Sequence, residues 1–432
     1  MRAQLSGEGV PYLVLEVPRT SLLEDSLAFL RSVPDADLTK ELKIKFKGEQ
    51  GVDAGGLKKE FFQLLVPQLF DPVVGMFSRT AHEEVFFNAA CDWYLDEYEL
   101  AGLLVGLAVY NSVVLEVRLP VVAYKKLLYA GAHTPEFEPT LSDLGQLDAG
   151  LAKGLRSLLT YDPPTDVEAV FCRTFEDDDP NSAPGAGDMV ELALDGAQTP
   201  VTGENREDYV AALCDYRLKT AVATQFDRFA EGFWRVLGQS SIERVVEAEE
   251  LRVMVQGDEA PLDWEVLQGV CAYEGFGESA PAGGDGNATA DGEPAGDAGS
   301  GESMPPGGDD EAPDGTGASP LRRNSSHSHS HSEVPVIKAL WAAVASFDDA
   351  LQRDFLMFVT GSKTAPMGGL GALRPPAHSS FKVQRDGPDS NRMPTSHTCF
   401  NTLLLPEYDP PSKLAKILEY AVREGHEGFA LE

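Results

Sequence analysis

An acidic, low-complexity segment places the first constraint on how this chain can fold. Residues 278–320 are rich in Gly, Ala, Pro and Ser, and they hold ten Asp or Glu but no Lys or Arg. A segment this poor in aromatic and branched side chains cannot bury enough apolar surface to offset the entropy lost on ordering. We therefore expect a disordered insertion at about 278–333, with folded sequence on both sides of it.

Charge and cysteine content exclude several classes of function. The 432 residues include 35 Lys or Arg against 69 Asp or Glu, a formal net charge of −34, so neither nucleic acid nor an acidic membrane is an expected partner. The five cysteines are scattered without a Cys-x-x-Cys pair, which predicts a reducing compartment and no metal site. The glycines of 49–56 lack a phosphate-binding pattern, and no cofactor is expected. We expect a cytoplasmic location, with the nucleus as an alternative.

Hydrophobic spacing predicts a mixture of helices and short strands. Strands are expected at 10–18, 42–46, 380–383 and 399–405, and in a small mixed region at 165–204 that includes 167–175 and 189–194. Helices are expected at 21–31, 57–69, 98–130, 141–160, 205–237, 336–347 and 412–423. The uncharged run from Leu100 to Leu115 is shorter than the roughly 20 residues of a membrane span, and with Gly102 and Gly106 it predicts a buried, closely packed helix. Phe226, Phe229 and Phe233 form a helical stripe typical of a core.

One cysteine, Cys399, lies between short polar residues and an apolar run. If the chain is extended here, His397 projects on the same face as Cys399, and Thr398 on the other. A nearby imidazole or strand-end amides would raise the thiolate fraction, but an isolated cysteine is also commonly a small buried hydrophobe. Local chemistry therefore permits a nucleophile at Cys399 without requiring one.

Several sequence words closely resemble HECT-type ubiquitin ligases, and most closely the E6-associated-protein-like group. The resemblance is carried by two sets of words, one in each half of the chain. Those of the second half are Phe358-Val-Thr-Gly361, Pro366-Met-Gly-Gly-Leu-Gly371, Asp386-Gly-Pro-Asp389, Pro394-Thr-Ser-His-Thr-Cys-Phe-Asn401 and Leu405-Pro-Glu-Tyr408. Those of the first half are Phe46-x-Gly-Glu-Gln-Gly-Val-Asp-Ala-Gly-Gly56, Lys59-Glu-Phe-Phe62, Gly106-Leu-Ala-Val-Tyr-Asn111 and Glu204-Asn-Arg-Glu-Asp-Tyr209.

The resemblance implies an α+β, bilobal fold. A mostly helical N-lobe would span 1–257, with a small mixed α/β subdomain at about 151–215 that docks a ubiquitin-conjugating enzyme. A hinge would join it to a smaller α/β C-lobe at 258–432, interrupted by the acidic insertion. The implied enzyme accepts ubiquitin from the conjugating enzyme as a thioester on Cys399 and transfers it to lysines of protein substrates.

The resemblance also assigns further residues. Its conjugating-enzyme groove falls on Leu151, Leu155, Leu158, Tyr161, Ala169, Phe171 and Tyr209, with Ala169 and Phe171 placed on a strand. The three leucines, at helical spacing, are equally typical of a core face. The hinge falls on Gly257, Asp258 and Glu259, after a strand at 251–255. Near the chain end, Phe429 would anchor the tail for transfer, and Glu432 would orient or deprotonate the acceptor lysine.

Two alternatives stay open at this point. A binding or scaffold protein for conjugating enzymes would keep the groove without transferring ubiquitin, and a cysteine hydrolase would need triad partners that the sequence does not single out. No substrate-binding module precedes residue 10. We therefore expect either a fragment of a longer ligase, or substrate recruitment by the HECT region itself or by another protein.

Overall fold

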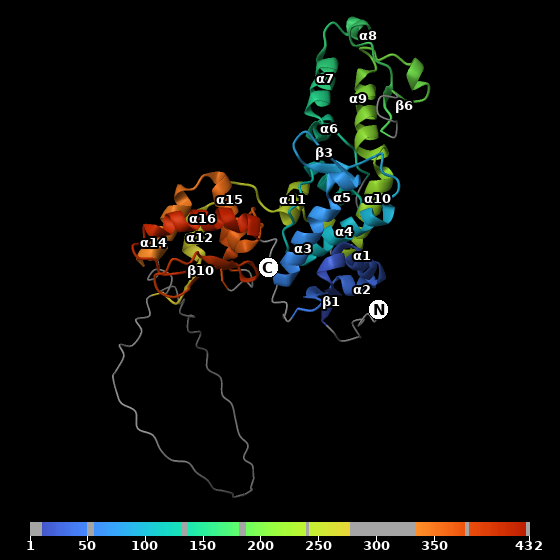
Figure 1. Cartoon of the computed structure of the whole chain (residues 1–432). Coiled ribbons are helices and arrows are strands. Elements are labelled where there is room, and N and C mark those ends of the chain that lie inside the picture. The colour runs from blue at the N-terminus through green and yellow to red at the C-terminus, as the bar shows by residue number, and fades with distance from the viewer. Residues whose placement is uncertain are drawn as a thin grey trace, which may run out of the picture.

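The computed structural model describes residues 11–49, 56–131, 136–180, 187–238, 242–276, 334–375 and 380–428. Two bodies are visible, which we call the N-lobe (residues 11–256) and the C-lobe (residues 258–428) (Figure 1). Each has its own apolar core, and the cores change over between Val255 and Trp264. The predicted insertion at 278–333 lies outside the described residues.

The N-lobe begins with two parallel strands, β1 (Tyr12–Val17) and β2 (Glu41–Phe46), joined through helices α1 (Leu22–Ser32) and α2 (Asp35–Leu38). Alternate residues of both strands are buried, which confirms the half-buried strand predicted at 42–46. The helix α3 (Gly56–Leu69) packs against β2, and a short hairpin of β3 (Phe77–Arg79) and β4 (Val85–Phe87) follows.

The centre of the N-lobe is a pair of helices, α4 (Leu95–Tyr110) and α10 (Ala223–Leu237). Phe226, Phe229 and Phe233 are all buried on α10, as predicted. The α4 helix is buried over most of its length, which confirms the close packing expected around Gly102 and Gly106. None of the described helices is both long enough and apolar enough to span a membrane.

Three more helices complete this lobe, α5 (Val121–Tyr129), α6 (Leu141–Leu147) and α11 (Ala248–Gln256). The outer subdomain (residues 149–215) protrudes from it at the top of Figure 1. It consists of the helices α7 (Ala149–Thr160), α8 (Val167–Phe171) and α9 (Arg206–Asp215) with the antiparallel pair β5 (Glu176–Asp178) and β6 (Met189–Glu191).

Two predicted strands are wrong, because both segments are helical. Residues 167–171 form α8, where Val167 and Phe171 are one helical turn apart and only Val167 is fully buried. Residues 251–255 belong to α11, where Leu251 and Val255 are buried at the same spacing. The predicted helix at 205–237 is also interrupted, by a π-helical turn at Tyr216–Thr220 between α9 and α10.

The C-lobe is a four-stranded sheet with helices packed against it. The strand order is β7 (Ala272–Glu274), β8 (Lys382–Arg385), β10 (Thr402–Leu405) and β9 (Thr395–His397). The first three strands are parallel, and β9 runs antiparallel to β10. The helices are α12 (Trp264–Val270), α14 (Pro335–Ser346), α15 (Asp349–Thr360) and α16 (Lys413–Gly428). Helices and strands are therefore both present, in agreement with the expected α+β class.

A buried lysine in the N-lobe core yields a prediction about stability. Lys126 on α5 is only 5% exposed, and its Nζ has no hydrogen-bond partner among the described residues. The ammonium lies 4.0 Å from the centre of the Phe226 ring. Burial lowers the pKa of Lys126 to about 7, although Asp227 and Asp215 nearby favour the charged form.

We expect Lys126→Met to stabilise the N-lobe by about 2 kcal/mol at neutral pH, because it removes a desolvated amine and loses only a cation–π contact. The gain should shrink as the pH rises towards about 10, since the unfolded lysine then also loses its proton. Chemical denaturation at several pH values measures this. Lys125→Met is the matched control and should destabilise, because Lys125 pairs with the buried Asp143 at 2.7 Å. Equal effects of the two changes would contradict the prediction.

Candidate active site and interlobe junction

Cys399 lies in a tight turn at one end of the C-lobe sheet, between β9 and β10. Thr398–Phe400 form a 3₁₀ turn, and Asn401 follows in the left-handed conformation with φ of 47°. The chain then reverses, so that His397 pairs with Thr402 across the two strands. The predicted strand at 399–405 is therefore correct only from residue 402. The expectation that His397 and Cys399 share a strand face is wrong, since Cys399 is not in a strand.

The residues around this turn differ in exposure. His397 and Phe400 are exposed, Thr398 is half-buried, and Asn401 is only 1% exposed. We call Thr398–Asn401 the catalytic turn, after the role that the sequence resemblance predicts for Cys399. Asparagine tolerates the left-handed conformation better than most residues do, and a buried amide needs hydrogen-bond partners.

The partner of Asn401 comes from the other lobe. Lys59 on α3 lies 2.8 Å from Asn401 Oδ1, and the same Nζ is 3.3 Å from the carbonyl oxygens of Thr360 and Thr398. Gln63, one turn along α3, donates a hydrogen bond to the carbonyl oxygen of Gly361. The catalytic turn is therefore held directly against the N-lobe in this structure.

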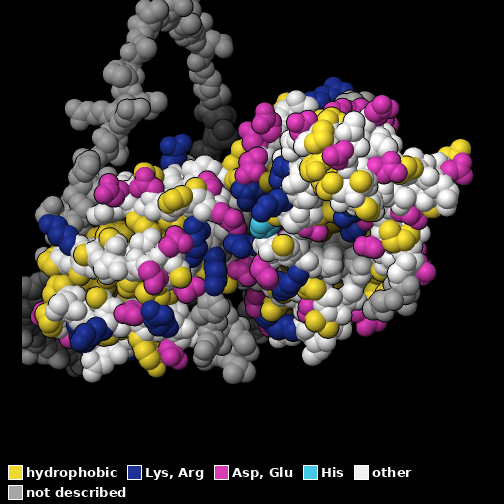
Figure 2. Space-filling model, turned by 90° about the horizontal axis from the view of Figure 1, so that it is seen from above, with side chains coloured by type: hydrophobic (Ala, Val, Ile, Leu, Met, Phe, Trp, Pro, Cys, Tyr) yellow, Lys and Arg dark blue, Asp and Glu magenta, His cyan; other side chains and the backbone are white. Residues whose placement is uncertain are grey.

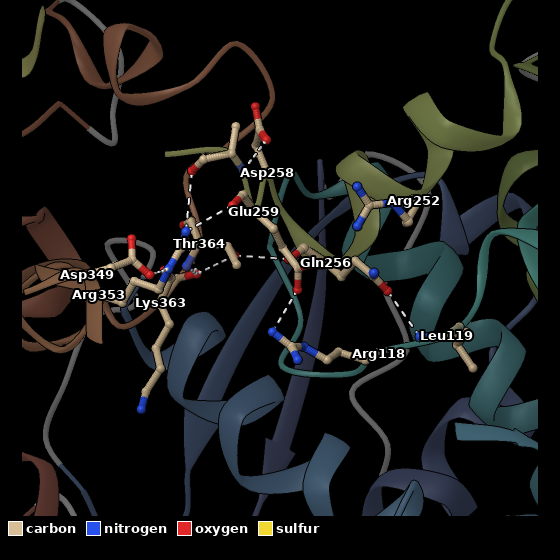
Figure 3. A network of polar contacts seen from close by, with 12 residues as sticks. Arg118, Leu119, Arg252, Gln256, Asp258, Glu259, Asp349, Arg353, Lys363 and Thr364 are labelled. Atoms are coloured by element: carbon tan, nitrogen blue, oxygen red, sulfur yellow. Dashed lines mark hydrogen bonds and ion pairs between the residues drawn. The ribbon is translucent and has the colours of Figure 1, made fainter. Parts of the chain in front are cut away.

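A second junction forms around the predicted hinge residues (Figure 3). Asp258 and Ala365 exchange backbone hydrogen bonds of 2.7 and 3.2 Å, which fixes the start of the C-lobe. On the N-lobe side, Glu259 forms an ion pair of 2.8 Å with Arg118. Gln256 joins the two sides, because its side chain accepts from the Leu119 amide while its carbonyl accepts from Thr364.

Gly257 has a conformation that other residues rarely adopt. Its φ is 78° and its ψ is 175°, a region that is essentially restricted to glycine. A Cβ built at this position would lie 2.2 Å from Thr364 Oγ1. A glycine is therefore required here by both the backbone and the neighbouring side chain.

We expect Gly257→Ala to weaken this junction by about 1 to 3 kcal/mol, because alanine must leave the glycine conformation and push Thr364 away. Hydrogen exchange of the Asp258 amide, which donates to Ala365, reports the opening directly. Gly269→Ala on α12 is the matched control, since a Cβ there meets no atom within 4 Å. Unchanged protection of Asp258 in Gly257→Ala would refute the prediction.

The residues predicted to dock a conjugating enzyme divide by burial. Leu155, Leu158 and Tyr209 are 3%, 1% and 0% exposed, so they form the core beneath the surface and cannot themselves contact a partner in this conformation. Leu151, Tyr161 and Phe171 are half-buried and Ala169 is exposed. The rings of Tyr161 and Phe171 meet edge to face at 5.5 Å.

These accessible residues lie on an apolar part of the outer subdomain. Val170, which stands between Ala169 and Phe171 on α8, is 53% exposed. Figure 2 looks onto this end of the molecule and shows hydrophobic side chains gathered on its surface. Arg206 fixes the end of α7 next to this surface, because it donates hydrogen bonds to the carbonyl oxygens of Leu158 and Tyr161.

Several contacts at the junctions were not foreseeable from local sequence. Lys59, Gln63, Arg118 and Gln256 have no pattern that singles them out, although Lys59 stands within one of the family-like words. The expected tail residues Phe429 and Glu432 lie outside the described residues, so their roles stay predictions. Within the described ranges no group of His, Cys, Asp or Glu has an arrangement suited to a metal ion.

Comparison with known proteins identifies the family. The model of the HECT-domain (ubiquitin-transferase) family matches residues 63–282 and 314–432. "Probable E3 ubiquitin-protein ligase mug30" of Schizosaccharomyces pombe is 33% identical over 96% of this chain and 46% of its own length. "Probable E3 ubiquitin-protein ligase HECTD2" of Mus musculus is 32% identical over 100% of this chain and 48% of its own. The human "Probable E3 ubiquitin-protein ligase HERC4" is 30% identical over 98% of this chain and 33% of its own length.

The chain thus spans between a third and a half of the length of these relatives. The family match includes both the outer subdomain and the catalytic turn, and it reaches the last residue. The chain belongs to the HECT-domain (ubiquitin-transferase) family.

Proposed function

We propose that this chain is a HECT-type ubiquitin ligase that carries ubiquitin on Cys399. The observation that carries the proposal is the position of this cysteine in the turn between β9 and β10, within the family match and between the exposed His397 and Phe400. In the first step the Cys399 thiolate attacks the carbonyl carbon of the thioester that joins ubiquitin to the conjugating enzyme. A new thioester forms, and the thiolate of the conjugating enzyme leaves.

In the second step the amine of a substrate lysine attacks the new thioester. An isopeptide bond forms, the Cys399 thiolate leaves, and the amine releases a proton. Thioester exchange is nearly balanced in free energy, so the protein mainly has to position the groups and supply a thiolate. His397, Thr398, Phe429 and Glu432 are our candidates for assisting these steps.

We place the conjugating enzyme on the apolar surface of the outer subdomain. Leu151, Tyr161, Ala169 and Phe171 support this location because they are accessible, and Ala169 and Phe171 flank the exposed Val170 on α8. Aromatic and apolar side chains of this kind commonly form the centre of protein–protein interfaces. The buried Leu155, Leu158 and Tyr209 would hold this surface in shape. Asp258 and Glu259, with Gly257, would form the hinge that lets the C-lobe change its orientation.

We also propose a subgroup of the family and a cellular location for this chain. The words around Cys399 and Gly361 support a place in the E6-associated-protein-like group of the family. The free thiols of Cys91, Cys172, Cys214 and Cys271 support a reducing location, the cytoplasm or the nucleus.

Reconstitution with ubiquitin-activating enzyme, a conjugating enzyme, ATP and ubiquitin tests the proposed function. We expect an adduct of this chain with ubiquitin that reductant removes, followed by isopeptide-linked products. A protein that binds the loaded conjugating enzyme but forms no adduct would instead be a transfer-deficient scaffold. Cleavage of ubiquitin conjugates without ATP would indicate a cysteine hydrolase.

A further inference from the structure

The Lys59 ammonium is surrounded by hydrogen-bond acceptors of the C-lobe. Its Nζ faces two backbone carbonyl oxygens and one amide oxygen, those of Thr360, Thr398 and Asn401, at 3.3, 3.3 and 2.8 Å. Thr360 is the last residue of α15, and the C-terminal end of a helix favours a cation. Asn401 is 1% exposed and its backbone is fixed in the left-handed conformation, so its amide oxygen is held in place.

The neighbouring contact shows that α3 closely approaches the same corner of the C-lobe. Gly361 has φ of 76°, and a Cβ built on it would lie 2.7 Å from Gln63 Nε2. A side chain at this position would therefore displace the Gln63 amide from its hydrogen bond with Gly361. Lys59 and Gln63 lie one turn apart on one face of α3, and both donate to this corner.

The catalytic turn packs against α3, in the main body of the N-lobe. Figure 1 shows the C-lobe beside the main body of the N-lobe, level with α3 and α11, while the outer subdomain with α7 and α8 protrudes at the top. A loaded conjugating enzyme on the outer subdomain would therefore lie on a different part of the N-lobe from the contact between Lys59 and the catalytic turn. The arrangement seen here suits a step in which the conjugating enzyme takes no part.

We propose that Lys59 is a positioning residue for discharge of ubiquitin, because it holds the catalytic turn on the N-lobe while an acceptor amine attacks the thioester. This inference rests on the proposed function. In that attack the isopeptide bond forms, the bond between the thioester carbon and sulfur breaks, and negative charge develops on the Cys399 sulfur. The Lys59 ammonium lies 3.3 Å from the carbonyl oxygen of Thr398, the residue before Cys399, so it holds the backbone that carries the thiol.

Separating the two half-reactions tests this role. The chain is charged with ubiquitin, the supply is stopped, and loss of the adduct to free lysine is timed in a single turnover. We expect Lys59→Met to slow discharge about 10-fold, as expected for a misplaced reacting group, while charging from the conjugating enzyme stays within about twofold of wild type. Lys59→Arg should restore most of the discharge rate, because it keeps the positive charge and the donors.

The neighbouring Lys58 provides the matched control. Its Nζ lies 3.4 Å from Asn111 Oδ1 within the N-lobe, so Lys58→Met removes the same charge from a side chain that contacts the N-lobe. It should discharge ubiquitin as wild type does. Asn401→Gly removes the amide oxygen while tolerating the left-handed backbone, and the effect of Lys59→Met should be smaller in that background.

A readout without ubiquitin separates failure of this inference from failure of the proposed function. Hydrogen exchange of the amides in residues 398–403 should be faster in Lys59→Met than in Lys58→Met. Equal exchange, or equal discharge rates in the two variants, would overturn the role of Lys59. Equal slowing of charging and discharge in Lys59→Met would also overturn it, since that pattern indicates general damage to the fold.

Discussion

Cys399→Ala is expected to abolish the ubiquitin adduct completely. Alanine has no nucleophilic atom, so no thioester can form at this position. Among the described cysteines, burial raises the pKa of Cys214 to about 11 and raises that of Cys271 even further. Both thiols are therefore protonated at neutral pH and cannot replace Cys399 as the acceptor. Non-reducing gel electrophoresis, with and without reductant, measures the adduct.

The exposed Cys172 is the control for this experiment. It is the most accessible cysteine whose side chain is described, and it lies on the outer subdomain directly after α8. Cys172→Ser should leave adduct formation intact. Cys399→Ser should form, if anything, an oxygen ester that resists reductant and is cleaved by alkali. A reductant-sensitive adduct that persists in Cys399→Ala would exclude Cys399 as the carrier.

Much of the fold could be predicted because many segments bury one face. The strand β2 and the helices α3 and α10 show the expected periods of burial. For short segments the spacing of apolar residues does not distinguish a strand from a helix. Val167 and Phe171 are compatible with period two as well as with one helical turn, and only packing of Val167 into the core decides for a helix.

The candidate site was only partly predictable for a similar reason. The apolar run after Cys399 does form a strand, but Asn401 turns the chain sharply just before it. The contact that stabilises this turn joins Lys59 to Asn401 across 342 positions of sequence. No local pattern encodes such a pairing, because it depends on how two separately folded cores meet.

The two junctions together explain how one lobe orientation can be stable and still be changed. At the hinge, Gln256 and Asp258, on either side of Gly257, bond to Thr364 and Ala365 of the C-lobe, while Arg118 of the N-lobe pairs with the exposed Glu259. Surface ion pairs contribute only about 0 to 1 kcal/mol. The contact of Lys59 with Asn401, which is 1% exposed, is more buried than this ion pair. Release of that contact would free the C-lobe to rotate about the hinge.

Gly102→Ala is expected to destabilise the N-lobe by about 3 kcal/mol or more, which is the largest stability effect we anticipate for a single methyl group. A Cβ at residue 102 would lie 1.8 Å from the carbonyl oxygen of Phe229, and one at Gly232 would lie 1.8 Å from that of Glu99. The backbones of α4 and α10 thus touch at both glycines. Because backbone atoms cannot rotate aside as a side chain can, the two helices must separate and open the aromatic core around Phe229.

A glycine-to-alanine substitution at an exposed helical position should instead increase stability. Gly154 lies on the exposed side of α7, and a Cβ there meets no atom within 4 Å. Gly154→Ala should stabilise its helix by up to about 1 kcal/mol, because alanine loses less backbone entropy than glycine on folding. Hydrogen exchange measures the two effects separately, with the α10 amides reporting on Gly102→Ala and the α7 amides on Gly154→Ala. A local measurement is needed because the two lobes need not unfold together. If Gly102→Ala left the protection of α10 unchanged, the close approach of the two backbones would be incorrect.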